Sequence, residues 1–267
     1  MSAAAALRRL ALAAILAAPF LTAQSRMAHA EIPLNERRSG YEDMSADNKA
    51  MQDDDTSNPA MLAVLDGEAL WNAKAGASGK SCADCHGEAK STMKGVAARY
   101  PAIPQGSDKP VDLEGRINLC RTSQQQAEAL KPESQELLGL SAYVTHASRG
   151  LPIAPPDDPR LAKIRDAGKA LFTRREGQLN LSCANCHDDN AGKKLAGATI
   201  PQGHPTAYPV YRSEWQTVGS LKRRLRNCLI GMRAEPYEYG APEYIALELY
   251  LMSRARGMRL ETPAVRP

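Results

Sequence analysis

The chain has 267 residues, a length that allows one or two domains. It holds 34 basic and 30 acidic residues, and its formal net charge of +4 gives no reason to expect nucleic-acid binding. Only 5% of its residues are aromatic, so cores of ordinary size would lack the large rings that usually fill them.

Residues 1–30 have the three parts of an export signal. Arg8 and Arg9 form a positive start, residues 11–23 are an apolar run, and Ala28-His29-Ala30 matches the small-x-small cleavage pattern. The run is shorter than the roughly 20 apolar residues needed to span a bilayer. We therefore expect cleavage after Ala30 and a periplasmic protein without a membrane span. Because the leader contains three arginines and no acidic residue, the mature chain would be close to neutral.

Beyond the cleavage site, composition divides the chain into four parts. Residues 31–58 are polar and acidic, and we expect them to form an irregular N-terminal extension. Residues 59–150 and 160–267 hold the apolar segments of two domains. Between them, residues 151–159 contain four prolines in nine positions, which blocks a helix and favours a linker.

The two domains repeat each other in sequence. The segment Gly67–His86 matches Gly168–His187 at an offset of 101 residues, and Glu136–Tyr143 matches Glu243–Tyr250 at an offset of 107. Apolar residues recur at helical spacing in the closing segments, and no strand-like alternation is visible. Each domain is therefore expected to be mostly α-helical, with an opening helix, a cysteine motif, an irregular middle and a closing helix.

A motif of the form C-x-x-C-H stands in each half: Cys82-Ala-Asp-Cys85-His86 and Cys183-Ala-Asn-Cys186-His187. This pattern is typical of c-type haem attachment. The two cysteines can form thioethers to both vinyl groups of a porphyrin, and the following histidine can bind the iron. We therefore expect two tandem, class I-like cytochrome c domains related by duplication, with two haem c groups per chain. Buried porphyrins would also explain the few aromatic side chains.

Two cysteines remain outside the motifs, Cys120 and Cys228, each between the motif and the closing helix of its own half. They can form a disulfide with each other, remain buried thiols, or bind the haem irons as distal thiolates. Matched placement in a duplicated unit favours ligation, since a disulfide needs no such equivalence. Met232 is an alternative distal ligand for the second iron.

A basic run precedes Cys228: Lys222-Arg223-Arg224-Leu225-Arg226-Asn227. On a helix, Arg224 would lie one turn from Cys228, where its guanidinium could hold a small oxyanion and lower the thiol pKa. The alternatives are a solvated basic face or contacts with haem propionates. Because Cys120 follows no such run, we expect the second haem to be the reactive one.

The chain resembles the SoxA family, the two-haem subunits of the sulfur-oxidising SoxAX cytochromes. The resemblance covers essentially the whole mature chain and rests on both C-x-x-C-H motifs, the position of Cys120, and the segments Arg223–Arg233 and Tyr244–Tyr250. It implies an L-cysteine S-thiosulfotransferase that joins thiosulfate to a cysteine of the SoxY carrier protein, in its SoxYZ complex, and passes electrons to haem. The implied partner is SoxX, a small single-haem cytochrome.

The resemblance also implies roles for individual residues. His86 and Cys120 would bind the first iron, and His187 and Cys228 the second. Cys228 would be the catalytic residue, found as a persulfide, and Arg224 would bind substrate. Two other functions remain open: a two-haem electron carrier without a substrate of its own, and a thiosulfate dehydrogenase that forms tetrathionate.

Overall fold

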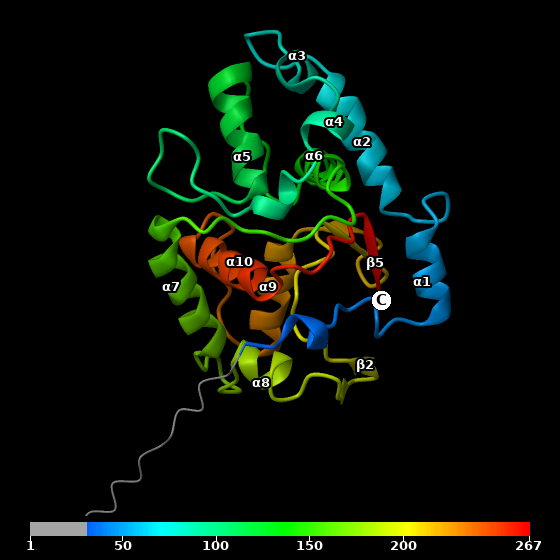
Figure 1. Ribbon diagram of the computed structural model, residues 1–267, viewed down its shortest axis with the longest axis vertical. Coiled ribbons are helices and arrows are strands. Elements are labelled where there is room, and N and C mark those ends of the chain that lie inside the picture. Colours follow the sequence, from blue (N-terminus) through cyan, green and yellow to red (C-terminus); the bar gives the residue numbers. More distant parts are fainter. Residues whose placement is uncertain (1–30) are drawn as a thin grey trace, which may run out of the picture. The chain divides into compact units, whose positions relative to one another are not determined.

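The computed structural model describes residues 31–267, so the expected export signal over residues 1–30 lies outside the described part. Residues 31–267 form one compact unit (Figure 1). No helix in this part is long and apolar enough to cross a membrane. The α-helices are α1 (Ala46–Asp53), α2 (Met61–Asn72), α3 (Cys82–His86), α4 (Ala89–Thr92), α5 (Leu113–Cys120), α6 (Gln135–His146), α7 (Ala162–Thr173), α8 (Cys183–His187), α9 (Leu221–Gly231) and α10 (Pro242–Arg254). The strands are β1 (Lys194–Leu195), β2 (Ala198–Thr199), β3 (Val210–Arg212), β4 (Thr217–Gly219) and β5 (Ala264–Arg266).

The first half is built around the crossing of α2 and α6. Val64 and Trp71 of α2 and Leu140 of α6 belong to one buried apolar cluster. Gly67 lies where the helices approach most closely, since a Cβ atom there would collide with the backbone of Gly139. The missing side chains therefore allow the opening and closing helices of this half to touch.

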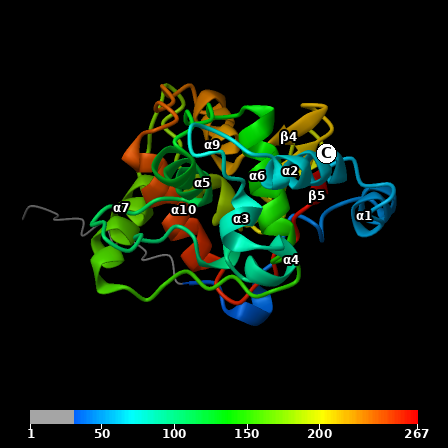
Figure 2. The same ribbon diagram turned by 90° about the horizontal axis from the view of Figure 1, so that it is seen from above.

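The second half repeats this crossing with α7 and α10, which lie side by side in Figures 1 and 2. Gly168 takes the place of Gly67, and a Cβ atom on it would collide with the backbone of Ala246. Phe172 of α7 and Leu247 of α10 pack in one buried cluster. The repeated sequence thus forms repeated structure, which confirms the expected duplication of a mostly helical fold.

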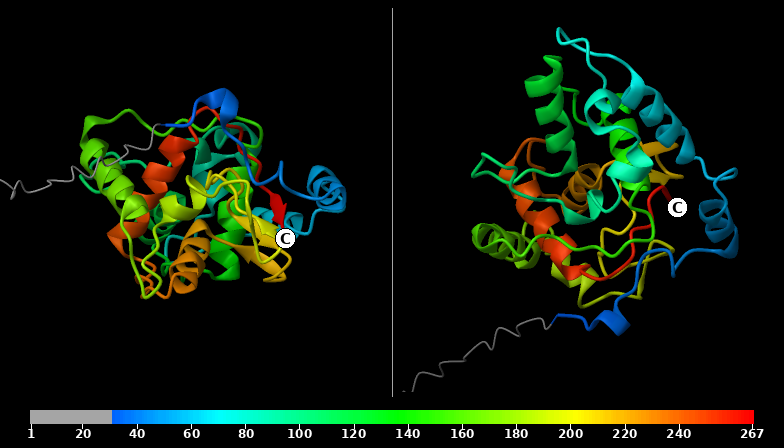
Figure 3. Two further views of the ribbon diagram at one scale, coloured as in Figure 1. Left: turned by 90° about the horizontal axis from the view of Figure 1, so that it is seen from below. Right: turned by 45° about the horizontal axis from the view of Figure 1, so that its top comes forward.

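Short strands add to the helices, although no strand was expected from the sequence. In one sheet, β3 pairs antiparallel with β4, with Val210 opposite Gly219, and parallel with β5, with Val210 opposite Ala264. Figure 3 shows β5, in red, beside these strands. β1 and β2 form a separate two-residue pairing. Strands of two or three residues are too short for alternation to reveal them.

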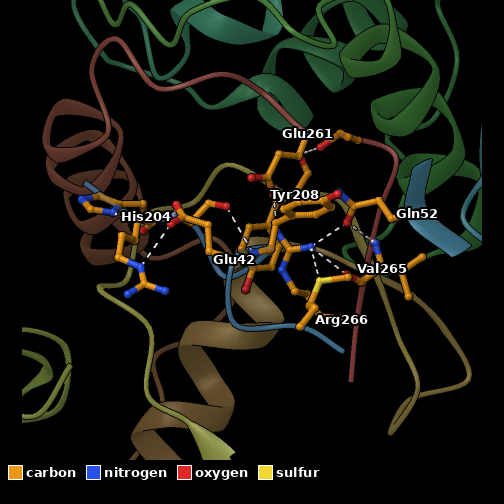
Figure 4. A network of polar contacts seen from close by, with 12 residues as sticks. Glu42, Gln52, His204, Tyr208, Glu261, Val265 and Arg266 are labelled. Atoms are coloured by element: carbon orange, nitrogen blue, oxygen red, sulfur yellow. Dashed lines mark hydrogen bonds and ion pairs between the residues drawn. The ribbon is translucent and has the colours of Figure 1, made fainter. Parts of the chain in front are cut away.

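The N-terminal extension is an ordered part of the fold, where the sequence suggested an irregular segment. Its helix α1 packs against the C-terminal strand β5. The Gln52 side-chain oxygen accepts hydrogen bonds from the Val265 amide at 3.0 Å and from the Arg266 guanidinium at 2.6 Å (Figure 4). Arg266 also pairs with Glu261. These partners are far apart in the chain, so local sequence patterns could not show them.

The proline-rich linker over residues 151–159 is packed against the segment that follows α10. Leu151 accepts a backbone hydrogen bond from Leu260 at 3.0 Å, and Ile153 donates one to Met258 at 2.8 Å. Ile153 is fully buried. The linker therefore holds the end of the second half against the first.

Candidate functional site

The two cysteine motifs fold as short helices, α3 and α8, that begin with matching caps. The Ser81 hydroxyl accepts from the Asp84 amide at 3.0 Å, and the Asp84 carboxylate accepts from the Ser81 amide at 2.7 Å. Ser182 and Asn185 make the same two bonds at 3.2 and 3.1 Å. Such reciprocal caps fix where each helix begins, and they place both cysteines and the histidine of a motif on one short helix.

The histidine of the second motif faces Cys228. His187 Nδ1 donates to the Pro201 carbonyl at 2.7 Å, which leaves Nε2 for another partner. The His187 side chain is hydrogen-bonded to the thiol of Cys228 on α9. A histidine and a thiol that face each other from two helices can serve as the two axial ligands of one iron.

The first motif shows fewer contacts of this kind. The His86 ring lies 5.6 Å from the Trp71 ring, and the Trp71 indole donates to the Gly87 carbonyl at 2.9 Å. Cys120, at the end of α5, lies near Cys82 of the motif. Among the described residues, no hydrogen bond joins Cys120 to His86.

The remaining cysteines do not form a disulfide, since Cys120 and Cys228 are both free thiols. Cys228 lies close to Cys183, just as Cys120 lies close to Cys82. Each therefore belongs to the motif of its own half, as the distal-ligand hypothesis requires.

The basic run before Cys228 lies on the helix α9, in a middle segment that was expected to be irregular, and it is not a solvated face. Arg224 lies one turn before Cys228 on α9, with a third of its side chain exposed. Arg223 stacks over the Trp215 ring at 4.3 Å. Arg226 points elsewhere, donating to the Tyr237 carbonyl. Each cation of the run thus has its own environment, and Arg224 is the one directed to the thiol.

A second arginine near Cys228 comes from a distant segment that the sequence analysis missed. Arg212 of β3 has only 15% of its side chain exposed, and its Nε lies 2.9 Å from the Glu214 carboxylate. Arg224 approaches the same carboxylate at 4.0 Å. Burial and the neighbouring Arg224 lower the pKa of Arg212. Two guanidiniums that share the half-exposed Glu214 carboxylate can together bind a small dianion.

The electrostatic surroundings of Cys228 favour the thiolate. Burial raises the pKa of this thiol, but the His187 hydrogen bond and the positive charges of Arg224 and Arg212 outweigh burial and leave the pKa below its ordinary value. A thiol of this kind is a better nucleophile and metal ligand near neutral pH than an ordinary buried cysteine.

Comparisons with known proteins agree with this geometry. Residues 66–153 and 167–260 each match the family model described as SoxA/TsdA, cytochrome c domain. The chain is 37% identical, over 88% of its length and 82% of the relative's, to the L-cysteine S-thiosulfotransferase subunit SoxA of Pseudaminobacter salicylatoxidans. The chain belongs to the SoxA family. The SoxA subunit of Rhodovulum sulfidophilum is 34% identical over 90% of this chain and 83% of that protein. The crystal structure of SoxXA from P. pantotrophus superimposes with a TM-score of 0.83 at 32% identity, covering 86% of this chain and 87% of that one.

As a cytochrome c of the SoxA family, the chain binds haem c covalently. The residues present fit the group, because each motif places two cysteines and a histidine on one short helix, the donor set that haem c attachment needs. The small cavity beside Cys183 has a mixed lining that includes Leu171, Leu247, Arg174 and Glu176. Met232 is buried and packs in a cluster with Tyr244. The contact of His187 with the Cys228 thiol agrees with Cys228 as the distal ligand, and Met232 stays the alternative prediction.

The first half keeps part of the arrangement around Cys228. Arg116 lies one turn before Cys120 on α5, as Arg224 does before Cys228 on α9. The expectation that Cys120 lacks the basic setting therefore holds for the full run but not for this one position. The matching arginine was visible in the sequence, at four residues before each cysteine.

Proposed function

We propose that this chain is the catalytic subunit of an L-cysteine S-thiosulfotransferase, which joins thiosulfate oxidatively to a cysteine thiol of a carrier protein. The observation that carries this function is the convergence of Arg224 and Arg212 on the Cys228 thiol. The relatives at 34% and 37% identity are named for the same activity. The reaction joins the outer sulfur of thiosulfate to the carrier sulfur and releases one proton and two electrons.

Two haem c groups per chain are part of this proposal. Cys82 and Cys85 would attach the first, and Cys183 and Cys186 the second. His86 with Cys120, and His187 with Cys228, would be the axial iron ligands. The haems supply the acceptor for the two electrons.

The residues around Cys228 account for the chemical steps. Arg224 and Arg212 bind the thiosulfate dianion by charge-assisted hydrogen bonds, in a site where burial strengthens them. The Cys228 thiolate, alone or extended by a persulfide sulfur, bonds to the outer sulfur of thiosulfate as two electrons leave. The carrier thiolate then attacks that sulfur and displaces Cys228, which is ordinary thiol exchange. The carrier thiol has lost its proton beforehand.

A SoxX-like single-haem cytochrome is the proposed partner, and a SoxYZ carrier is the proposed protein substrate. The similarity to SoxXA from P. pantotrophus supports the first of these. Export to the periplasm after cleavage behind Ala30 completes the proposal. An electron carrier without a substrate has less support, because the relatives at 34% and 37% identity are named as transferase subunits. The SoxA relatives also favour sulfur transfer over tetrathionate formation.

The proposal is tested by mixing the haem-loaded chain and its partner cytochrome with thiosulfate, carrier protein and an oxidised cytochrome as electron acceptor. Intact-mass spectrometry of the carrier should show a thiosulfate adduct on its cysteine, formed in step with haem reduction. Tetrathionate as the main product, with an unmodified carrier, would identify a thiosulfate dehydrogenase. Haem reduction without either product would contradict both enzymatic functions.

A further inference from the structure

A buried group of charged side chains joins the two helices that carry Cys120 and Cys228. Lys222, near the start of α9, pairs with Asp112 and with Glu114, the latter at 2.9 Å. Asp112 also caps α5, where its carboxylate accepts from the Gly115 amide at 2.7 Å. All three side chains are nearly inaccessible to solvent. The ligand helices of the two halves are therefore tied together at their N-terminal ends.

A third carboxylate, Glu248 of α10, lies at the same place without a partner. It lines the same cavity of about 70 Å³ as Asp112, Glu114 and Lys222. Among the described residues, no hydrogen bond or ion pair involves the Glu248 carboxylate, whereas the other two acids share Lys222. The Ser141 hydroxyl, which also lines the cavity, is buried and unpaired.

The charged side chains at this cavity do not balance one another, since the acidic ones outnumber Lys222. Three carboxylates against one ammonium leave two negative charges uncompensated in a poorly solvated cavity, which raises the affinity of these carboxylates for a proton. Of the three, Glu248 gains least from Lys222 and so binds a proton most readily. Burial and the charge of Asp112 together raise the pKa of Glu248 well above its ordinary value. The other titratable groups that line the cavity are Tyr100 and Tyr208.

The cavity lies within electrostatic reach of both distal cysteines. At a rise of about 1.5 Å per residue, Asp112 is roughly 12 Å along α5 from Cys120, and Lys222 is roughly 9 Å along α9 from Cys228. At such distances in a protein interior, one unit of charge changes the proton affinity of a carboxylate roughly tenfold. An electron that arrives at either haem would therefore change the affinity of Glu248 for its proton.

We propose that Glu248 is a redox-linked proton site: its carboxylate takes up one proton from solvent when the haems are reduced and releases it when they are oxidised. Asp112, Glu114 and Lys222 position this carboxyl and keep its charge uncompensated. The inference rests on haem binding by the chain and not on thiosulfate transfer. In the proposed reaction, the proton on Glu248 would compensate the negative charge of an electron that is held on a haem before it passes to the partner.

The test is a spectroelectrochemical titration of the haem-loaded chain between about pH 5 and pH 9, with no thiosulfate present. At least one haem potential should fall as the pH rises, by at most about 59 mV per unit, since a tenfold change for one electron is 59 mV. In Glu248→Gln this slope should be lost, and the potential at alkaline pH should lie above that of the wild type. The control is Glu136→Gln, which removes an exposed glutamate from the first turn of α6 and should keep the slope.

A second measurement keeps the proposal testable if Glu248→Gln alters haem binding. The reduced-minus-oxidised infrared spectrum of the wild type should contain a protonated-carboxyl band that is sensitive to deuterium. Glu248→Asp should shift this band, and Glu136→Gln should leave it in place. A wild-type potential that does not depend on pH, or a slope that persists in Glu248→Gln, overturns the assignment.

Discussion

The chemistry at Cys228 depends on side chains from three separate segments. His187 comes from the haem motif on α8, Arg224 from the helix of the thiol itself, and Arg212 from the short strand β3. Burial alone would keep the thiol protonated, and these three groups reverse that effect. The reactivity of the site is therefore expected to depend on each of them in a measurable way.

Replacing Arg224 by alanine should reduce thiosulfate transfer about ten- to a hundred-fold. A charge-assisted hydrogen bond to a dianion contributes about 1.5–3 kcal/mol, and each 1.36 kcal/mol corresponds to a factor of ten in rate. Arg224→Lys should restore only part of the activity, because an ammonium lacks the planar fork of a guanidinium. Steady-state transfer to the carrier thiol, with haem spectra recorded for each variant, is the measurement.

The matched control for Arg224 is Arg223→Ala. Arg223 lies next to it in sequence and carries the same charge, but stacks on Trp215. Arg226 is a poorer control, because it donates to the Tyr237 carbonyl and its loss would disturb the loop after α9. Equal losses of activity in Arg224→Ala and Arg223→Ala would indicate a docking surface for the carrier and would refute the substrate-binding role.

Arg212→Ala should raise the KM for thiosulfate more than it lowers kcat. Arg212 shares Glu214 with Arg224 and lies farther along the chain from the reacting thiol, so its loss should weaken binding of the dianion first. The KM should rise at least several-fold, in line with one lost charge-assisted contact. An unchanged KM would show that Arg212 only supports Glu214.

The two cysteines outside the motifs should not be equivalent. Cys228→Met should keep both haems and abolish transfer, because the nucleophilic sulfur is lost. Cys120→Met should keep both haems and substantial activity while raising one potential, because a thioether donates less charge to iron than a thiolate. Activity assays and redox titration of both variants provide the test, and similar losses in the two would contradict the division of labour between the halves.

At the scale of helices and strands, the sequence was informative wherever the pattern was local. The repeat predicted the opening and closing helices of both halves. It missed the helices α5 and α9 in the middle segments, which were expected to be irregular, although the four-residue spacing placed Arg224 and Cys228 on one face if that segment was helical. It gave no sign of Arg212, which lies 16 residues from Cys228 on a strand of only three residues. The order of the N-terminal extension was also missed, because Gln52 finds its partners on β5 at the other end of the chain.

The helix crossings depend on glycines that allow backbone contact. In Gly168→Ala, the new Cβ would collide with the Ala246 carbonyl of α10, so the helices would have to separate. Overpacking of this kind lowers the free energy of unfolding by about 1–3 kcal/mol. Guanidinium unfolding of the haem-loaded chain measures the change. Gly231→Ala is the control, since a Cβ there meets no atom within 4 Å and alanine favours the helix.

At the scale of the whole molecule, the two halves share more than a linker. The backbone bonds of Leu151 and Ile153 hold the end of the chain, and Lys222 ties α9 to α5. The sequence divided the chain at residues 151–159, but it could not show this buried charge contact, because Asp112 and Lys222 are 110 positions apart. The electrostatic state of one half is therefore coupled to that of the other.

Despite this coupling, each half is expected to attach its haem without the other, and the number of haems per chain tests this expectation. Each motif has its own capped helix and its own apolar cluster, so each half holds the parts needed to attach a haem. When the chain is made with the cytochrome c maturation machinery, its mass from Glu31 should exceed the polypeptide mass by two haems. Replacing Cys82 and Cys85 by serine should leave one covalent haem, held by Cys183 and Cys186. The ferric signals of this second haem should be the same as in the wild type.

A wild-type mass with a single haem would contradict the two-haem assignment. Loss of both haems from the double variant would instead show that the second half cannot fold around its haem until the first is filled.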